Sequence, residues 1–138
     1  MMPQEAPDTS PKNSPAKILL VDDDEVLLAH IGRTLQNQGY LVESCEDAHQ
    51  ALLKIKGGGF DLMITDVRMP EASGTALAEM ARKNCPSLPI VVISSDEVLA
   101  KAWSGHGKTG AVFIHKPFTV KELIAGVRAA LKAGPPKS

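Results

Sequence analysis

The sequence has only two cysteines, Cys45 and Cys85, in 138 residues. Two cysteines are too few for a disulfide framework, and their separation does not match a metal-binding pattern. We therefore expect both thiols to pack as small apolar side chains in a reducing compartment. The four histidines share no ligand spacing either, so we expect surface or packing roles for them.

Strong charge and long apolar runs are also lacking. The formal net charge is -1 at pH 7, which is not the basic balance typical of a nucleic-acid-binding protein. No apolar run approaches the ~18 residues of a membrane span, and the N-terminus has no apolar segment typical of a secretory signal. We therefore expect a cytoplasmic protein that binds neither nucleic acid nor membranes.

The length of 138 residues suits one domain with a sizeable core. Residues 1–15 are rich in proline and polar side chains, which predicts a disordered N-terminal tail. Residues 16–132 would form the folded domain. Residues 133–138, with the sequence AGPPKS, would be a C-terminal tail or the start of a linker.

Five short apolar runs alternate with helical patterns. They cover residues 17–22, 40–45, 61–66, 90–95 and 111–116. Near-continuous apolar runs are typical of strands buried on both faces of a parallel sheet. Five strand–helix units predict an α/β fold, a flavodoxin-like three-layer (βα)5 sandwich whose five-stranded parallel sheet has the order 2-1-3-4-5. The fourth helical pattern, residues 97–110, carries three glycines, so we expect that helix to be short and mobile.

Capping signals support three of the expected helices. Gly39 would end the first helix, because glycine tolerates the backbone conformation found there. Asp47 with Gln50, and Thr119 with Glu122, form capping boxes that predict the starts of the second and fifth helices.

Polar side chains stand at the carboxyl ends of the expected strands. Carboxyl ends of parallel strands meet at one edge of the sheet, and ligands bind there, near the point where the strand order reverses. We therefore expect these side chains to lie close together: Asp22, Asp23, Asp24, Asp66, Ser94, Ser95 and Lys116.

Carboxylates held this closely repel each other, and one would be protonated unless a cation neutralises the group. Mg²⁺ fits best, because it usually takes one or two carboxylates, keeps several waters and shares a phosphate oxygen. Lys116 and a serine hydroxyl would contact other phosphoryl oxygens. Aspartate is a known nucleophile toward phosphoryl groups, and such transfers depend mainly on positioning and charge neutralisation. The pattern therefore predicts a phosphoryl-transfer site.

Four segments, in this order and at domain-sized spacing, resemble a known family: LLVDDDEVLL, DLMITDVRMPEASG, PIVVISSDE and VFIHKPF. Together they resemble the response-regulator receiver domain of two-component signalling. The resemblance implies a domain that accepts a phosphoryl group from a sensor histidine kinase or a phosphotransfer protein. Such a domain is a switch that takes part in its own phosphorylation and dephosphorylation, and is not an enzyme.

The resemblance also implies a role for individual residues. Asp66 would be the phosphoacceptor, with Ser94 and Lys116 contacting the phosphoryl group. Ser94 and Phe113 would be the two switch residues. The bond between Lys116 and Pro117 would be cis, as is typical of the family.

The same resemblance implies a Mg²⁺ site. Its ligands would be Asp22, Asp23, Asp66 and the backbone carbonyl of Arg68, with Asp22 acting partly through water. Asp24 would be a bystander at the start of the first helix, where the helix dipole favours a negative charge.

Phosphorylation would reshape the face formed by the fourth helix, the fifth strand and the fifth helix. That face would control an output domain or partner, and it is also a possible homodimer surface. The sequence does not identify the kinase, the output or the stable oligomer.

Two other functions compete with this interpretation. DDDEV also fits the nucleophile motif of haloacid-dehalogenase-like phosphatases, with Asp22 as nucleophile and Asp24 as acid/base. That family usually needs a later acidic pair near a strand end, but Glu122, inside an expected helix, is the only acid after Lys116. The other alternative is a receiver-like interaction module that is never phosphorylated, which the full set of acidic, serine and lysine residues argues against.

Overall fold

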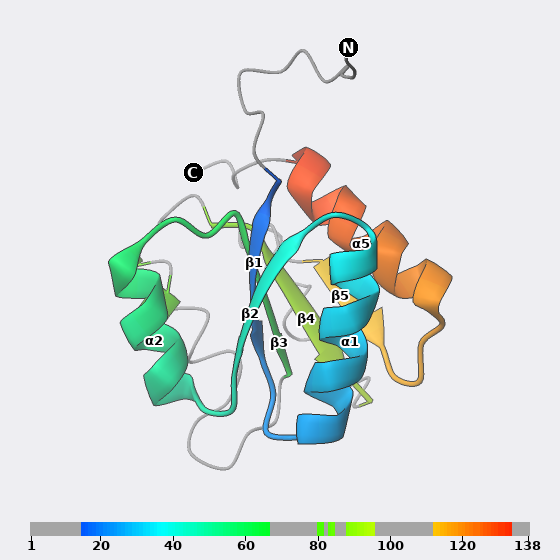
Figure 1. Cartoon of the computed structure of the whole chain (residues 1–138), viewed down its shortest axis with the longest axis horizontal. Helices are drawn as coiled ribbons and strands as arrows, with labels where there is room; N and C mark the ends of the chain where they lie inside the picture. The colour runs from blue at the N-terminus through cyan, green and yellow to red at the C-terminus, as the bar shows by residue number, and fades with distance from the viewer. Residues whose placement is uncertain (1–14, 67–79, 82, 85–87, 96–111, 134–138) are drawn as a thin grey trace.

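The computed structural model describes residues 15–66, 80–81, 83–84, 88–95 and 112–133 (Figure 1). Five strands form one sheet: β1 (Lys17–Val21), β2 (Leu41–Cys45), β3 (Leu62–Asp66), β4 (Ile90–Ser94) and β5 (Val112–His115). Their order is β2-β1-β3-β4-β5, and every neighbouring pair is parallel. The predicted topology is therefore confirmed.

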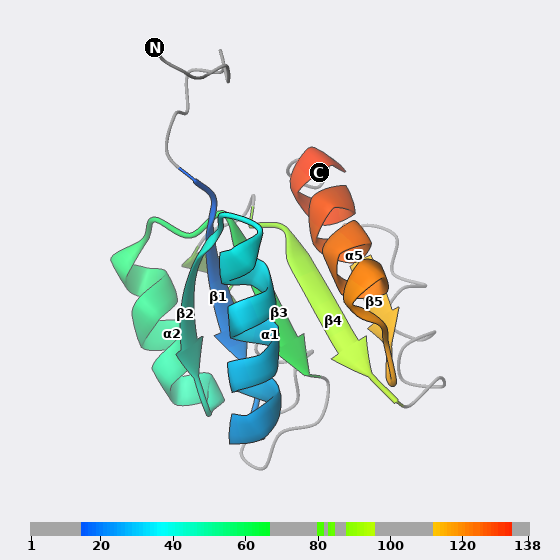
Figure 2. The same ribbon diagram turned by 45° about the vertical axis from the view of Figure 1, so that its right-hand side comes forward.

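Helices cover both faces of the sheet. α1 (Glu25–Asn37) and α5 (Val120–Ala133) lie on one face, and α2 (Ala48–Gly57) lies on the other (Figures 1 and 2). The predicted fourth helix, residues 97–110, lies outside the described residues. Among the helices that are described, none has the length and apolar character needed to cross a membrane.

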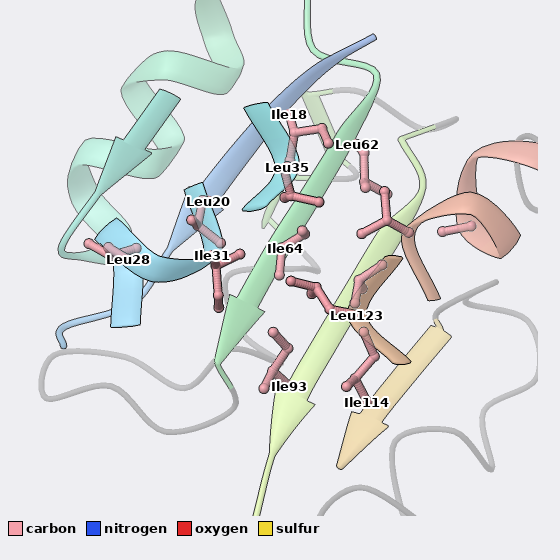
Figure 3. Packing of buried hydrophobic residues seen from close by; sticks show 13 residues of the cluster. Ile18, Leu20, Leu28, Ile31, Leu35, Leu62, Ile64, Ile93, Ile114 and Leu123 are labelled. Atoms are coloured by element: carbon pink, nitrogen blue, oxygen red, sulfur yellow. The ribbon is translucent and has the colours of Figure 1, made fainter. Parts of the chain in front are cut away.

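The core has two layers because successive side chains of a strand point to opposite faces. Ile18 and Leu20 of β1 pack with α1 and α5, in the cluster that Figure 3 shows. Leu19 and Val21 pack on the other face, with α2. All five residues of β4 are buried, as predicted for a strand covered on both faces. β2 differs, with Leu41 52% exposed, because it forms an edge of the sheet.

The capping signals are confirmed. The Gln50 backbone N–H donates to Asp47 Oδ1 at 2.8 Å at the start of α2. Before α5, the Thr119 N–H donates to Glu122 Oε1 at 2.8 Å, and the Glu122 N–H donates to Thr119 Oγ1 at 3.0 Å. Gly39, just past the end of α1, has a φ of 95°, a conformation that side chains other than glycine rarely adopt. These contacts fix where the helices begin and end relative to the strands.

Candidate functional site

The acidic segment after β1 places its three carboxylates in three different environments. Asp22 is only 3% exposed. Its backbone N–H donates to the Cys45 carbonyl at 3.2 Å, and its Oδ1 accepts the Asp24 N–H at 3.0 Å. Asp23 is exposed. Asp24 is the N-cap of α1, since its Oδ1 accepts the N–H groups of Val26 and Leu27. Asp22 is therefore held rigidly at the end of the strand, whereas Asp24 has the capping role expected of a bystander.

Lys116 joins the acidic segment to β3. Its backbone N–H donates to the Ser94 carbonyl at 2.9 Å, which extends the pairing of β4 and β5 by one residue. Its ammonium lies 2.7 Å from Asp66 Oδ2 and 3.9 Å from Asp22 Oδ2. The Lys116–Pro117 peptide bond is cis, as the resemblance implied. The structure thus brings together one cation and two carboxylates from three separate strand ends.

Burial raises the pKa of Asp22 to about 6. The nearby carboxylate of Asp66 also raises this pKa, while the hydrogen bond from the Asp24 N–H and the charge of Lys116 oppose the rise. One ammonium therefore does not fully compensate two carboxylates held in a poorly solvated site. A further cation would stabilise the ionised form of both acids.

The donor set suits a hard divalent cation. Mg²⁺ usually takes one or two protein carboxylates and fills its remaining positions with water and phosphate oxygens. The buried Asp22 and the partly buried Asp66 meet that requirement. Across the described ranges, no three acidic, histidine or cysteine side chains are already grouped as a metal site. The predicted carbonyl ligand, Arg68, lies outside those ranges.

Ser94 lies on β4 and Phe113 lies on β5, the two strands that follow β3 in the sheet. Ser94 is the last residue of β4 and is 2% exposed. In the parallel register of β4 and β5, Ser94 aligns with His115 and Val92 aligns with Phe113. Phe113 is partly buried and packs against the core cluster on the α2 face of the sheet. Both predicted switch residues therefore belong to the strand pair that carries Lys116.

One contact near the site was not anticipated from the sequence. The rings of Phe113 and His115 meet edge to face, with centroids 6.1 Å apart and an interplanar angle of 80°. The available signal was that the two residues lie two positions apart in the sequence, because this spacing places both side chains on the same face of a strand.

A comparison with known families and structures identifies relatives of this chain. Residues 18–128 match the model of the response regulator receiver domain. Response regulator MprA of Mycolicibacterium vanbaalenii is 32% identical over 122 residues, which cover 88% of this chain and 53% of the relative. The chain therefore spans about half the length of the curated relatives it matches.

Solved structures show the same fold. A response regulator receiver protein from Sinorhizobium medicae is 34% identical, with a TM-score of 0.77 over 86% of this chain and 96% of that one. A receiver domain protein from Methanospirillum hungatei is 30% identical, with a TM-score of 0.79 over 87% of this chain and 96% of that one.

Proposed function

The chain belongs to the response regulator receiver family, and from that membership we propose that Asp66 is the residue on which it carries a phosphoryl group. The donor would be the phosphohistidine of a sensor histidine kinase or of a phosphotransfer protein in the cytoplasm. The domain would act as a switch that takes part in its own phosphorylation and dephosphorylation, and not as an enzyme with a separate substrate.

The observation that carries this proposal is the position of the Lys116 ammonium. It lies 2.7 Å from Asp66 Oδ2, and the second carboxylate, Asp22, lies 3.9 Å from it. A cation beside a nucleophilic carboxylate attracts the anionic phosphoryl group and stabilises the charge on its oxygens. The ion pair also makes Asp66, and not Asp22, the carboxylate closest to that cation.

The transfer itself forms one bond and breaks one. An oxygen of the Asp66 carboxylate attacks phosphorus, while the bond between phosphorus and the donor's imidazole nitrogen breaks and its electron pair returns to the imidazole. Lys116 moves from the carboxylate to a phosphoryl oxygen, and the Ser94 hydroxyl donates a hydrogen bond to another. Positioning and charge neutralisation account for most of the catalysis of such reactions.

Asp22, Asp23, Asp66 and the carbonyl of Arg68 are the residues that we propose hold Mg²⁺. When bound, the ion supplies additional positive charge at the phosphoryl oxygens. Asp22 contributes a carboxylate whose position is already fixed by the Asp24 N–H. Asp23 contributes an exposed carboxylate next to Asp22.

Phosphorylation would then change the population of two arrangements of the domain. Ser94 would approach the phosphoryl group, and Phe113 would move with it on the neighbouring strand. The surface that changes would be that of β5, α5 and the expected fourth helix. This surface would control an output domain or partner protein, and it also offers a site for a homodimer.

The phosphatase alternative fits the site less well. It assigns the acid/base role to Asp24, but that carboxylate accepts two N–H groups as the cap of α1. The same alternative leaves the short contact between Lys116 and Asp66 without a role. An unphosphorylated interaction module is distinguished from the proposed function by experiment.

The test is phosphorylation by acetyl phosphate in the presence of Mg²⁺, followed by measurement of intact mass. The wild-type protein should gain one phosphoryl group, and Asp66→Asn should gain none. Asp24→Asn is a matched control, because asparagine also caps helices well, and it should behave like the wild type. Equal phosphorylation of wild type and Asp66→Asn would overturn the assignment, and no phosphorylation of any variant would favour the interaction module.

A further inference from the structure

The edge-to-face contact between Phe113 and His115 lies on β5, whose end leads directly into Lys116 of the proposed phosphoryl site. The two residues are two apart on β5, so their side chains lie on the same face. Ile114, between them, points the other way and packs with Leu123 of α5 (Figure 3). His115 is exposed, while Phe113 reaches into the core. The imidazole therefore contacts a ring that is partly buried, from the end of the strand nearer the site.

The same strand end carries Lys116, the residue after His115. Its backbone N–H donates a hydrogen bond to the Ser94 carbonyl at 2.9 Å, and its ammonium donates one to the Asp66 carboxylate. Phosphorylation of Asp66 would turn the carboxylate that Lys116 contacts into an acyl phosphate. Lys116 would then have to move to a phosphoryl oxygen, and a displacement of its backbone would also move His115.

We propose that His115 is a positioning residue that holds the Phe113 ring in the arrangement of the unphosphorylated domain. The inference rests on the proposed function, because it assumes that Asp66 is modified and that Phe113 changes position. The inference assigns a role to a residue that is not among the site residues implied by the family resemblance. In this role His115 acts through the Phe113 ring.

The consequence follows from linkage between two arrangements. A contact present in only one of them lowers the apparent affinity for any ligand that favours the other. Edge-to-face aromatic pairs contribute a modest stabilisation, so removal of the imidazole should strengthen binding of a phosphoryl mimic about two- to tenfold. An aromatic replacement at position 115 should restore most of the wild-type behaviour.

Beryllofluoride with Mg²⁺ is the probe, because it mimics a phosphoryl group on a carboxylate. The chain has three phenylalanines, so fluorophenylalanine labelling gives few resonances, and Phe113→Leu identifies the one at position 113. The measured quantities are the chemical shift of that resonance without ligand and the apparent Kd for beryllofluoride. The variants are His115→Ala, His115→Tyr and the control His49→Ala, which removes an exposed imidazole from α2.

We expect His115→Ala to shift the Phe113 resonance without ligand and to lower the apparent Kd about two- to tenfold. His115→Tyr should lie near the wild type, and His49→Ala should match it. In the Phe113→Leu background, His115→Ala should change the Kd much less, since the contact is already lost.

Two results would overturn the inference while leaving the proposed function intact. One is that His115→Ala leaves both the Kd for beryllofluoride and the chemical shift of the Phe113 resonance unchanged. The other is an equal change of the Kd in the Phe113→Leu background, which would show that His115 acts directly on Lys116 or on the ligand. A wild-type protein that binds no beryllofluoride would instead overturn the proposed function.

Discussion

Asp23 is an exposed carboxylate of the acidic segment that does not cap α1, so its contribution to Mg²⁺ binding can be tested without removing a helix cap. A ligand at about 100 times its Kd stabilises the folded state by about 2.7 kcal/mol. We predict that Mg²⁺ raises the melting temperature of the wild-type protein, and that Asp23→Ala loses most of that rise. Glu46→Ala, which removes an exposed carboxylate just after β2, is the control and should keep it. A full rise in Asp23→Ala would reject this ligand assignment.

Cys45 is buried at the end of β2, as the sequence predicted, and burial raises its pKa to about 11. The thiolate is the reactive form, so very little of it is present at neutral pH. We predict that iodoacetamide labels Cys45 in the folded protein far more slowly than in urea-unfolded protein, as followed by peptide mass mapping. Equal rates would show that this part of the sheet opens readily.

Two helical glycines give a matched comparison at the scale of elements. A methyl group on Gly32 of α1 would lie 3.9 Å from Val42 Cγ1, an ordinary contact. On Gly126 of α5 it would lie 2.7 Å from Ile114 Cδ1. Alanine is favoured over glycine in a helix by about 1 kcal/mol. We predict that Gly32→Ala stabilises the domain by up to that amount, and that Gly126→Ala gains nothing or destabilises it.

Urea unfolding of the two glycine variants provides the measurement. Equal stabilisation by both would mean that a methyl group at position 126 is accommodated between α5 and β5, so the close approach of α5 to β5 does not require glycine there. The spacing of this helix and strand bears on the proposed role of His115, because Ile114 lies between the two residues of the ring contact on β5.

Glu43 of the edge strand β2 forms ion pairs with a lysine of β1 and a lysine of α2. Its carboxylate lies 2.9 Å from the ammonium groups of both Lys17 and Lys54, and hydrogen bonds from Lys54 and Lys17 lower its pKa. A lowered pKa means that the unfolded chain binds more protons in acid. The stabilisation is therefore present above the ordinary pKa of 4.5 and is lost as the pH falls through the lower value of the folded state.

We predict that Glu43→Gln lowers the melting temperature by a few degrees at neutral pH, and by progressively less as the solution is acidified to about pH 3. The effect is small because the ion pairs are partly exposed to solvent and are screened by salt. Glu46→Gln serves as the control. A difference between wild type and Glu43→Gln that grows in acid would contradict the assigned sign.

At the scale of the whole molecule, the arrangement of the strands was predictable from the sequence. Apolar runs separated by helical patterns leave few parallel topologies, and capping residues such as Asp47 and Thr119 marked two helix starts. The exposure of β2 follows from its place at the edge, which a residue pattern alone does not show. The domain boundaries proposed at residues 16 and 132 stay a prediction.

The location of the site could be predicted from the sequence, but the contacts between its side chains could not. Strand ends bring Asp22, Asp66 and Lys116 to one edge of the sheet, but the 2.7 Å contact depends on the backbone after β5 and on the side-chain rotamers. The alignment of Ser94 with His115 depends on strand register, which the sequence did not specify. The contact between the Phe113 and His115 rings depends on side-chain rotamers, which the residue spacing alone does not specify. Arg68 lies outside the described residues, so its role stays a prediction.

Chemical location of the phosphoryl group is the most direct test of the central claim. Borohydride reduces an aspartyl phosphate to homoserine, and peptide sequencing by mass spectrometry then identifies the modified position. After treatment of the wild-type protein with acetyl phosphate and Mg²⁺, homoserine should be found at position 66. Homoserine at position 22, with Asp66 unmodified, would contradict the account and support the phosphatase alternative.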